Sequence, residues 1–142
     1  MENDLAELSL AQIIDMFGME RHPAAGWFNL HYSDSEAFGR PKISSIYVLL
    51  ADDDPLPMHK LDNVEVWHHY RGAPAEVTVS NGIGAPQVSI IGSDIVAGQR
   101  PQLAIPAFFW QSIRPLGRWS LLGCTMSPGF SSSASFLLSA AD

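Results

Sequence analysis

The spacing of apolar residues indicates one helix, close to the start of the chain. In the segment SLAQIIDMFG (9–18) the apolar residues recur at i, i+3, i+4 and i+7, as on one face of a helix: Leu10, Ile13, Ile14 and Phe17. Ser9 and Gln12 have the spacing of a capping box, in which each side chain bonds the backbone N–H of the other. Gly18 suits the left-handed residue that ends many helices. The sequence therefore predicts a helix over residues 9–17.

The rest of the chain consists of short segments rich in β-branched and aromatic residues, separated by turns with Pro, Gly or Asp. These segments are 43–51, 64–70, 75–80, 86–92, 102–106, 108–113 and 118–126. Asn81-Gly82, between two of them, is a strong hairpin signal. Short strands at intervals of about ten residues are typical of an antiparallel sandwich or barrel. We therefore predict an all-β fold.

The composition fits a single domain with a substantial core. The chain has 142 residues, of which 46% are hydrophobic and 16% charged. A chain of this length buries roughly two thirds of its unfolded surface, and this apolar fraction is slightly high for a monomer. We expect one domain over residues 1–142, which forms a homodimer by burying an exposed sheet edge.

The charge and the cysteine content limit which classes of partner and which cellular compartment we expect. Eight basic and fifteen acidic residues give a net charge of −7, and no Lys/Arg cluster offsets it, which argues against nucleic acid as a partner. No apolar run approaches the ~18 residues that cross a bilayer, and the first ten residues lack the features of a signal peptide. Cys124 is the single cysteine, so no intramolecular disulfide can form. We expect a cytoplasmic protein with no membrane partner.

The segment HKLDNVEVWHHYRG (59–72) carries most of the candidate chemistry, because it holds three of the five histidines and a carboxylate. Two interpretations stay open. His59 and Glu65 converge with a second histidine on one ligand, or they form a surface pair next to a turn, since residues 52–62 resemble a loop. That loop contains three consecutive aspartates, but it lacks the Gly and the closing Glu of an EF-hand, so we predict a solvated turn rather than a calcium site.

The second histidine of this group is either His68 or His69. Simple strand alternation puts His69 on the same face as Glu65 and Trp67, and puts His68 on the opposite face with Tyr70. A β-bulge near these residues would change that assignment.

Four separated motifs resemble one branch of the cupin superfamily, whose members are largely of unknown function. They are RHPAAGWF (21–28), HKLDNVEVWHHYRG (59–72), GQRPQLAIPAFFWQS (98–112) and LLGCTMSPGF (121–130). The resemblance runs from about Ile13 to Phe130, in the same order and at the same spacing. It implies a double-stranded β-helix, the cupin jelly-roll barrel, over about residues 25–130. It also implies a pocket inside the barrel and, in many members, a homodimer.

The general cupin pattern supplies roles for individual positions. His59 takes the place of the first metal-binding histidine and Glu65 takes the place of the glutamate, and Gly72 follows after six intervening residues, as the pattern requires. Leu61 replaces the second histidine and Gln111 replaces the last one. The resemblance thus implies a weak site for zinc, nickel, manganese or iron built from His59, Glu65 and Gln111, because a neutral amide is a poorer ligand than imidazole. His59 and Glu65 would be the catalytic pair, through metal-assisted or acid–base chemistry.

Further ligand contacts follow from the same resemblance. The branch pattern favours His68, which follows the tryptophan, over His69, and Tyr70 completes this group. Trp110 is a candidate because the second cupin motif, which ends at Gln111, lines the pocket in the family. Gln99 precedes that motif, and a structural role in its loop is an equal alternative.

Together these observations predict a cupin that binds a polar small molecule in its barrel, with a metal-dependent isomerase- or epimerase-like enzyme as its catalytic form. Two alternatives stay open: a metal-free module for a sugar-like or nucleotide-like ligand, and a structural dimeric barrel whose site has decayed. The substrate does not follow from the sequence, since one fold supports many chemistries.

Overall fold

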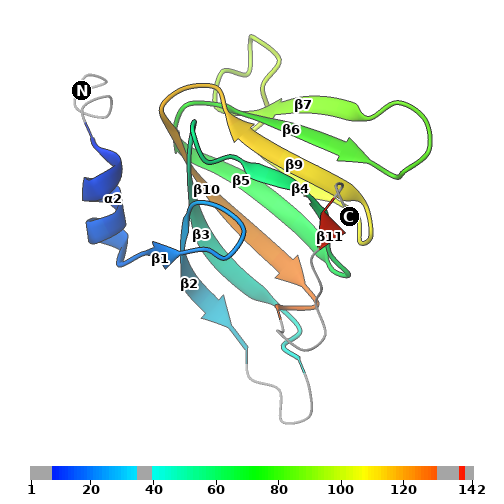
Figure 1. Ribbon diagram of the computed structural model, residues 1–142, viewed down its shortest axis with the longest axis horizontal. Helices are drawn as coiled ribbons and strands as arrows, with labels where there is room; N and C mark the ends of the chain where they lie inside the picture. Colours follow the sequence, from blue (N-terminus) through cyan, green and yellow to red (C-terminus); the bar gives the residue numbers. More distant parts are fainter. Residues whose placement is uncertain (1–7, 35–39, 131–137, 140–142) are drawn as a thin grey trace.

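The fold is a two-sheet jelly-roll barrel, as the sequence predicts, and the described part of the chain has one helix on the outside of the barrel. A computed structural model describes residues 8–34, 40–130 and 138–139 (Figure 1). Its elements are helix α2 (Leu10–Phe17) and strands β1 (Glu20–Arg21), β2 (Trp27–Ser33), β3 (Ser44–Ala51), β4 (Leu56–Lys60), β5 (Val64–Gly72), β6 (Ala75–Ser80), β7 (Gln87–Ile91), β8 (Gln102–Ile105), β9 (Trp110–Pro115), β10 (Trp119–Ser127) and β11 (Leu138–Ser139). No helix in the described part of the chain is both long enough and apolar enough to cross a membrane.

Both sheets are antiparallel, and their inner faces enclose the core. One sheet has the strand order β1-β2-β3-β10-β5-β8 and the other has the order β11-β4-β9-β6-β7. Consecutive strands of the chain therefore alternate between sheets at several points, as a jelly roll requires. The buried residues between the sheets are Ala25, Val48, Leu50, Leu56, Trp67, Ala75, Val77, Ile91, Ile105, Ile113, Leu122, Cys124 and Met126.

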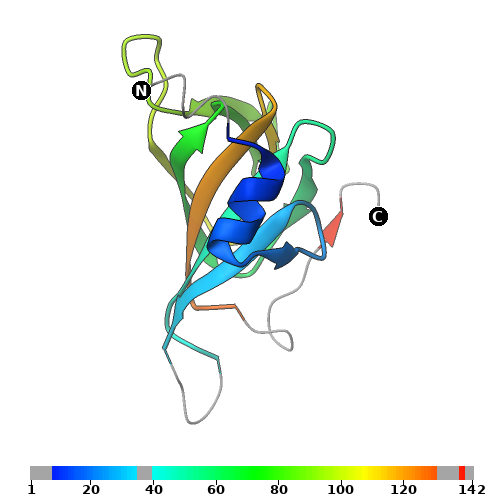
Figure 2. The ribbon, with the colours of Figure 1, turned by 90° about the vertical axis from the view of Figure 1, so that its left-hand side faces the viewer.

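Helix α2 begins and ends where the sequence predicts. The Gln12 N–H donates to Ser9 Oγ (3.1 Å) and the Ser9 N–H donates to Gln12 Oε1 (2.8 Å), so the capping box is complete. Gly18 ends the helix in the left-handed conformation, at φ 62°. The apolar face of the helix covers the outer face of the six-stranded sheet, where Ile13 packs in a second cluster with Leu49 and Trp119 (Figure 2).

Strand β4 corrects the loop-like interpretation of residues 52–62. Residues 56–60 form a strand that pairs with β9, and His59 lies directly opposite Gln111. His59 is 4% exposed and Glu65 is 3% exposed. The alternative of a surface pair next to a turn is therefore wrong.

The loop between β1 and β2 is fastened to the turn before β4 through Asp54. Asp54 Oδ2 accepts hydrogen bonds from Arg21 Nη1 (2.6 Å) and from the Gly26 N–H (2.9 Å). Gly26 has φ 69°, and a Cβ there would lie 2.3 Å from the Leu49 carbonyl oxygen, so this position requires glycine. The Arg21 hydrogen bond is the main cause that lowers the pKa of Asp54. Asp54 is thus a structural contact rather than part of a fully solvated turn.

Candidate functional site

The centre of the barrel holds a hydrogen-bonded network that crosses between the two sheets. Glu65 and Trp67 come from β5 in the six-stranded sheet, and Gln111 comes from β9 in the other sheet. The Trp67 Nε1–H donates to Gln111 Oε1 (3.0 Å), and Gln111 Nε2 donates to Glu65 Oε1. An indole N–H can only donate, so it fixes which end of the Gln111 amide faces Glu65. Both ends of this amide are therefore engaged.

Glu65 has a partner at each of its carboxyl oxygens. Besides the bond from Gln111, Oε2 accepts from the thiol of Cys124, at 3.4 Å. Burial raises the pKa of Glu65 above its usual value of 4.5, against the opposing effect of hydrogen bonds from Gln111, Cys124 and the nearby Trp67 indole. Burial, followed by the charge of Glu65, raises the pKa of Cys124, so Cys124 remains a thiol.

His59 points one ring nitrogen at the backbone of its own strand. Its Nδ1 lies 2.7 Å from the Pro57 carbonyl oxygen, and because a carbonyl can only accept, Nδ1 carries the proton. Burial lowers the pKa of His59 below 6.5, which keeps the ring neutral near pH 7. Its Nε2 therefore has an available lone pair, and no other described residue bonds to it.

A second imidazole, His22, is close enough to His59 for the two charges to affect each other. The Ala24 N–H donates to His22 Nδ1 (3.0 Å), the local bond that a histidine before a proline favours, so the proton of the neutral ring is on Nε2. The pKa of His22 is lowered mainly by burial and then by the charges of His59 and Arg21. One ring thus offers an acceptor and its neighbour offers a donor.

The predicted metal-ligand set does not fit a transition metal in this geometry. The oxygen that Gln111 would offer accepts from Trp67, and both oxygens of Glu65 are hydrogen-bonded. Of the three predicted ligands, His59 alone has a ligating atom, Nε2, that no described residue hydrogen-bonds. Within residues 8–34 and 40–130, no group of three or more His, Cys, Asp or Glu side chains is arranged to hold an ion. We derive no chemical step from a metal here.

Comparison with known proteins agrees with this architecture. Residues 11–138 match the family described as Cupin superfamily (DUF985), which is most of the chain. The chain is a cupin. A comparison with curated proteins gave no match.

Solved structures share the fold of this cupin. The crystal structure of a Shewanella oneidensis protein has a TM-score of 0.81 at 29% identity, over 89% of this chain and 82% of that one. A hypothetical protein from Leishmania major has a TM-score of 0.76 at 20% identity, over 87% and 83%. Oxalate decarboxylase from Bacillus subtilis has a TM-score of 0.64 at 18% identity, over 83% of this cupin but 29% of the enzyme. The last two likenesses concern the fold alone.

His68 and Tyr70 lie on the outside of the barrel in this cupin, away from Glu65. His68 is opposite Gly123 of β10, and its ring stacks on Tyr70 with centroids 6.1 Å apart. Tyr70 in turn covers Gly123, where a Cβ would lie 2.5 Å from its ring. The register of β5 and β10 shifts between Leu121 and Leu122, which leaves Tyr70 as the extra residue of a bulge. Because this bulge follows both histidines, the simple alternation holds for them.

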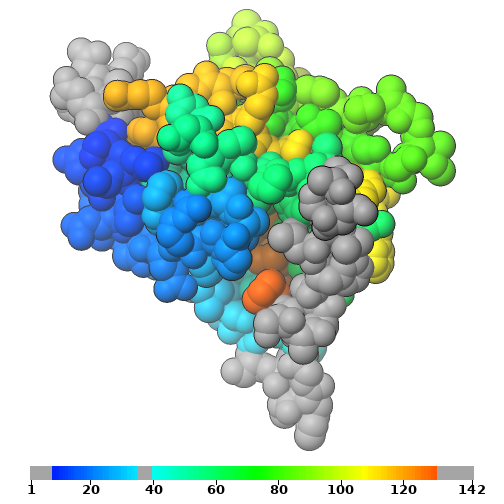
Figure 3. Space-filling view, in the orientation of Figure 1, coloured from blue at the N-terminus to red at the C-terminus, as the bar shows by residue number. Residues whose placement is uncertain are grey.

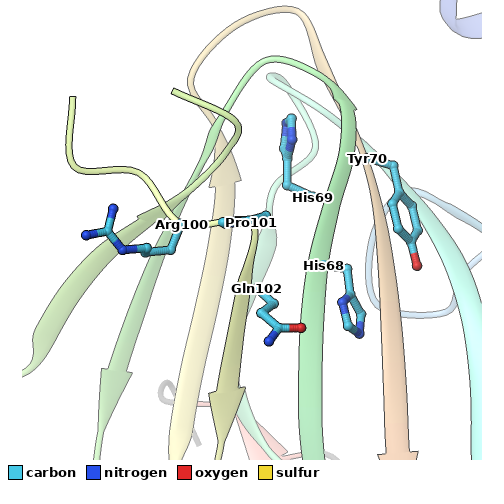
Figure 4. A pocket seen from close by; sticks show the side chains of 6 residues that line it. All are labelled: His68, His69, Tyr70, Arg100, Pro101 and Gln102. Atoms are coloured by element: carbon cyan, nitrogen blue, oxygen red, sulfur yellow. The ribbon is translucent and has the colours of Figure 1, made fainter. Parts of the chain in front are cut away.

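His69 is on the same face of β5 as Trp67, but it lies near the end of the strand. Its Nε2 bonds the Ala73 carbonyl oxygen at 2.9 Å. With His68 and Tyr70 it lines a hollow at this end of the barrel, shown in Figure 4, rather than the interior around Glu65.

Trp110 and Gln99 are not part of the central network. Trp110 lies next to Gln111 on β9 and therefore faces the other side of the sheet, where Lys60 Nζ is 5.0 Å from its ring centroid. Gln99 Oε1 accepts from the Asp94 N–H (3.1 Å), which is the structural loop role that the sequence left open.

The structure therefore brings together His59, Glu65 and Gln111 inside the barrel, and adds Trp67 and His22. No local signal in the sequence links His22 to His59, since 37 positions separate them. The motif RHPAAGWF contains His22. Because this motif belongs to the family resemblance, it was the one available signal.

Proposed function

We propose that this cupin binds a polar small molecule inside the barrel, next to His59 and His22, without a metal. The observation that carries the proposal is the state of His59: a buried, neutral imidazole with Nδ1 bonded to its own strand and Nε2 left over. In the described part of the chain, the side-chain atoms that are fully buried without a hydrogen-bond partner belong to Asn63, so His59 Nε2 keeps some access and can bond a ligand or a water molecule.

The surroundings of His59 support the same proposal. Glu65, Gln111 and Trp67 form hydrogen bonds with one another. They can therefore form the wall of the site whether or not a ligand is bound. His22 contributes a complementary N–H donor. Figure 3 shows the side of the barrel where the blue N-terminal segment approaches the green strands, with atoms of the orange β10 visible at depth between them. A polar molecule of modest size suits this combination of apolar walls and few polar groups.

A second candidate function, proton transfer, has its own support. The neutral Nε2 of His59 is a base and the Nε2–H of His22 is an acid, and their pKa values are both shifted by burial. A pair of this kind can remove a proton from one position of a bound molecule and return one to another, as an isomerase or epimerase does. Glu65 holds Gln111 in place in this scheme and is a positioning residue.

The test uses the ring signals of the histidines in an NMR titration of protein treated with EDTA. Adenosine and D-glucose serve as nucleotide-like and sugar-like probes. We expect one of them to shift the His59 and His22 ring signals, and we expect His59→Gln to weaken its binding by about tenfold or more. His31→Gln is the matched control, because His31 is an exposed residue on β2.

Shifts confined to His68 and His69, or equal binding by His59→Gln and the parent, would contradict the barrel site. Proton transfer has a separate readout: a bound sugar should take up deuterium at carbon from D2O, and His59→Gln should abolish this uptake. Binding without uptake would leave the binding function in place and exclude the enzymatic one for that sugar.

A further inference from the structure

The six arginines fall into two groups of three. Three form ion pairs with carboxylates: Arg21 with Asp54 (2.6 Å), Arg40 with Asp62 (2.7 Å) and Arg114 with Glu76 (2.9 Å). The others, Arg71, Arg100 and Arg118, are exposed, and none of them is in an ion pair with another described residue. Acidic residues outnumber basic ones by seven in this chain, so three unpaired arginines need a physical reason.

These three arginines line two hollows at one end of the barrel, although they come from different segments. Arg71 lies near the end of β5, Arg100 is in the loop before β8, and Arg118 is in the turn before β10. Arg71 and Arg118 line one hollow of about 540 Å³. Arg100 lines a second hollow of about 500 Å³, and the two hollows share His69 and Tyr70 (Figure 4). Three positive charges that form no ion pair with another described residue therefore line two adjoining hollows.

No carboxylate lines either hollow within the described part of the chain. The acidic residue nearest to Arg100 along the chain is Asp94, whose Oδ1 accepts from the Ala97 N–H. A concave surface with several cations and no anion raises the local concentration of negatively charged molecules.

The larger hollow has a rigid floor and a suitable set of donors. Gly72 has φ 81°, and a Cβ there would lie 2.4 Å from the Trp119 ring, so the backbone rests directly on the indole. Ser93 joins Arg71 and Arg118 in the lining. Guanidinium groups present paired N–H donors that match the oxygens of a carboxylate or a phosphate.

We propose that this end of the barrel is a second binding site, for a small molecule that carries a carboxylate or phosphate group, held by Arg71 and Arg118. It is separate from the interior around His59 and does not depend on the function proposed for it. Arg71 lies six positions beyond Glu65 on the same strand, which is about 20 Å at the rise of a β-strand.

Calorimetric titration with inorganic phosphate, sulfate and citrate at low ionic strength tests this site, with D-glucose as the uncharged probe. We expect the parent to bind phosphate or citrate, and we expect any binding of glucose to be the same in the parent and in the arginine variant. Arg71→Ala combined with Arg118→Ala should weaken the binding by at least about tenfold. Binding of phosphate alone would indicate a phosphate ester as the natural ligand, and binding of citrate alone would indicate a carboxylate. Both side chains are exposed, so this variant should fold.

The matched control is Lys42→Ala combined with Arg114→Ala, which changes the net charge equally at exposed positions outside both hollows. It should keep the affinity within about twofold of the parent, since distant exposed charges are screened. Equal weakening by both double variants would overturn the proposal, because it would mean a general charge effect. Loss of anion binding in His59→Gln would also overturn it, because the anion would then bind inside the barrel. If none of the three anions binds, the proposal is overturned as well.

Discussion

Gln111 donates a hydrogen bond to Glu65 across the barrel, from Nε2 to Oε1 at 2.5 Å, and so joins strands of different sheets. In the general cupin pattern the last metal-binding histidine stands at the place of Gln111. Here the amide accepts from one side chain of the facing sheet and donates to another. This replacement turns a ligand position into a link between the sheets.

Gln111→Met keeps the volume of this side chain but removes both of its hydrogen bonds. The Trp67 N–H and one oxygen of Glu65 then lose their partner in a buried environment. We expect the free energy of unfolding to fall by about 2–4 kcal/mol, because each buried unsatisfied group costs about 1–3 kcal/mol. Urea denaturation measures this change, with Gln87→Met on the exposed part of β7 as the control. Equal denaturation midpoints for the two variants would contradict the role of the link.

Glu65→Gln should change how stability depends on pH. The folded-state pKa of Glu65 is raised above 4.5, so the folded protein binds more protons than the unfolded chain just above that pH. The contribution of Glu65 is therefore fully present below pH 4.5 and is lost as the pH rises through the folded-state pKa. The variant should lack this loss. Denaturation of both proteins at several values from pH 4 upward checks the difference, and parallel curves would contradict it.

His59→Gln should change the pH dependence in the opposite direction. The folded-state pKa of His59 is lowered below 6.5, so the unfolded chain binds more protons in that range. The contribution of the neutral ring is present above pH 6.5 and is lost as the pH falls through the folded-state pKa. We expect the variant to lose less stability than the parent on acidification below pH 6.5. NMR titration of the His59 ring gives the pKa directly, and a value above 6.5 would contradict the prediction.

The sequence predicted the fold more completely than the site, for physical reasons. Helix α2 can be predicted from local signals at its ends: Ser9, Gln12 and Gly18 each bond to residues no more than four positions away. Strand β4 has no such signal, because it follows three aspartates and Pro55 and itself contains Pro57, and pairing with β9 decides its conformation. Contacts between the two sheets, such as the one between Gln111 and Glu65, depend on the tertiary fold, which local sequence signals do not determine. The sequence could propose them only through the resemblance to cupins.

Metal content distinguishes the proposed metal-free barrel site from a metal-binding one. Since both Glu65 and Gln111 are already bonded, we expect elemental analysis to find no stoichiometric metal. Zinc, nickel, manganese and iron should produce no shift in melting temperature that depends on His59 and Glu65. The comparison is between the parent and His59→Ala combined with Glu65→Gln. A shift that the double substitution abolishes would show that the network rearranges to bind an ion, contrary to the metal-free proposal.

Strand β8 is the edge strand that we propose as the interface of the expected homodimer. This strand ends the six-stranded sheet, next to β5, and Ala104 on it is exposed. We expect sedimentation at micromolar concentration to give a dimer, and we expect Ala104→Lys to shift it toward the monomer, since charged residues on an edge strand oppose pairing. A monomer at all concentrations would refute the dimer. A dimer that Ala104→Lys leaves unchanged would place its interface elsewhere.

The hydrogen bonds between Asp54 and the β1–β2 loop affect the rate and the entropy of ligand binding at His22. Arg21 and Gly26 hold the two ends of this loop, and His22 lies between them with its ring already bonded to Ala24. A ligand that meets a preorganised group loses less conformational entropy on binding than one that must first order a mobile loop. Association with His22 should therefore proceed in a single step, without a slow phase of loop closure after the encounter.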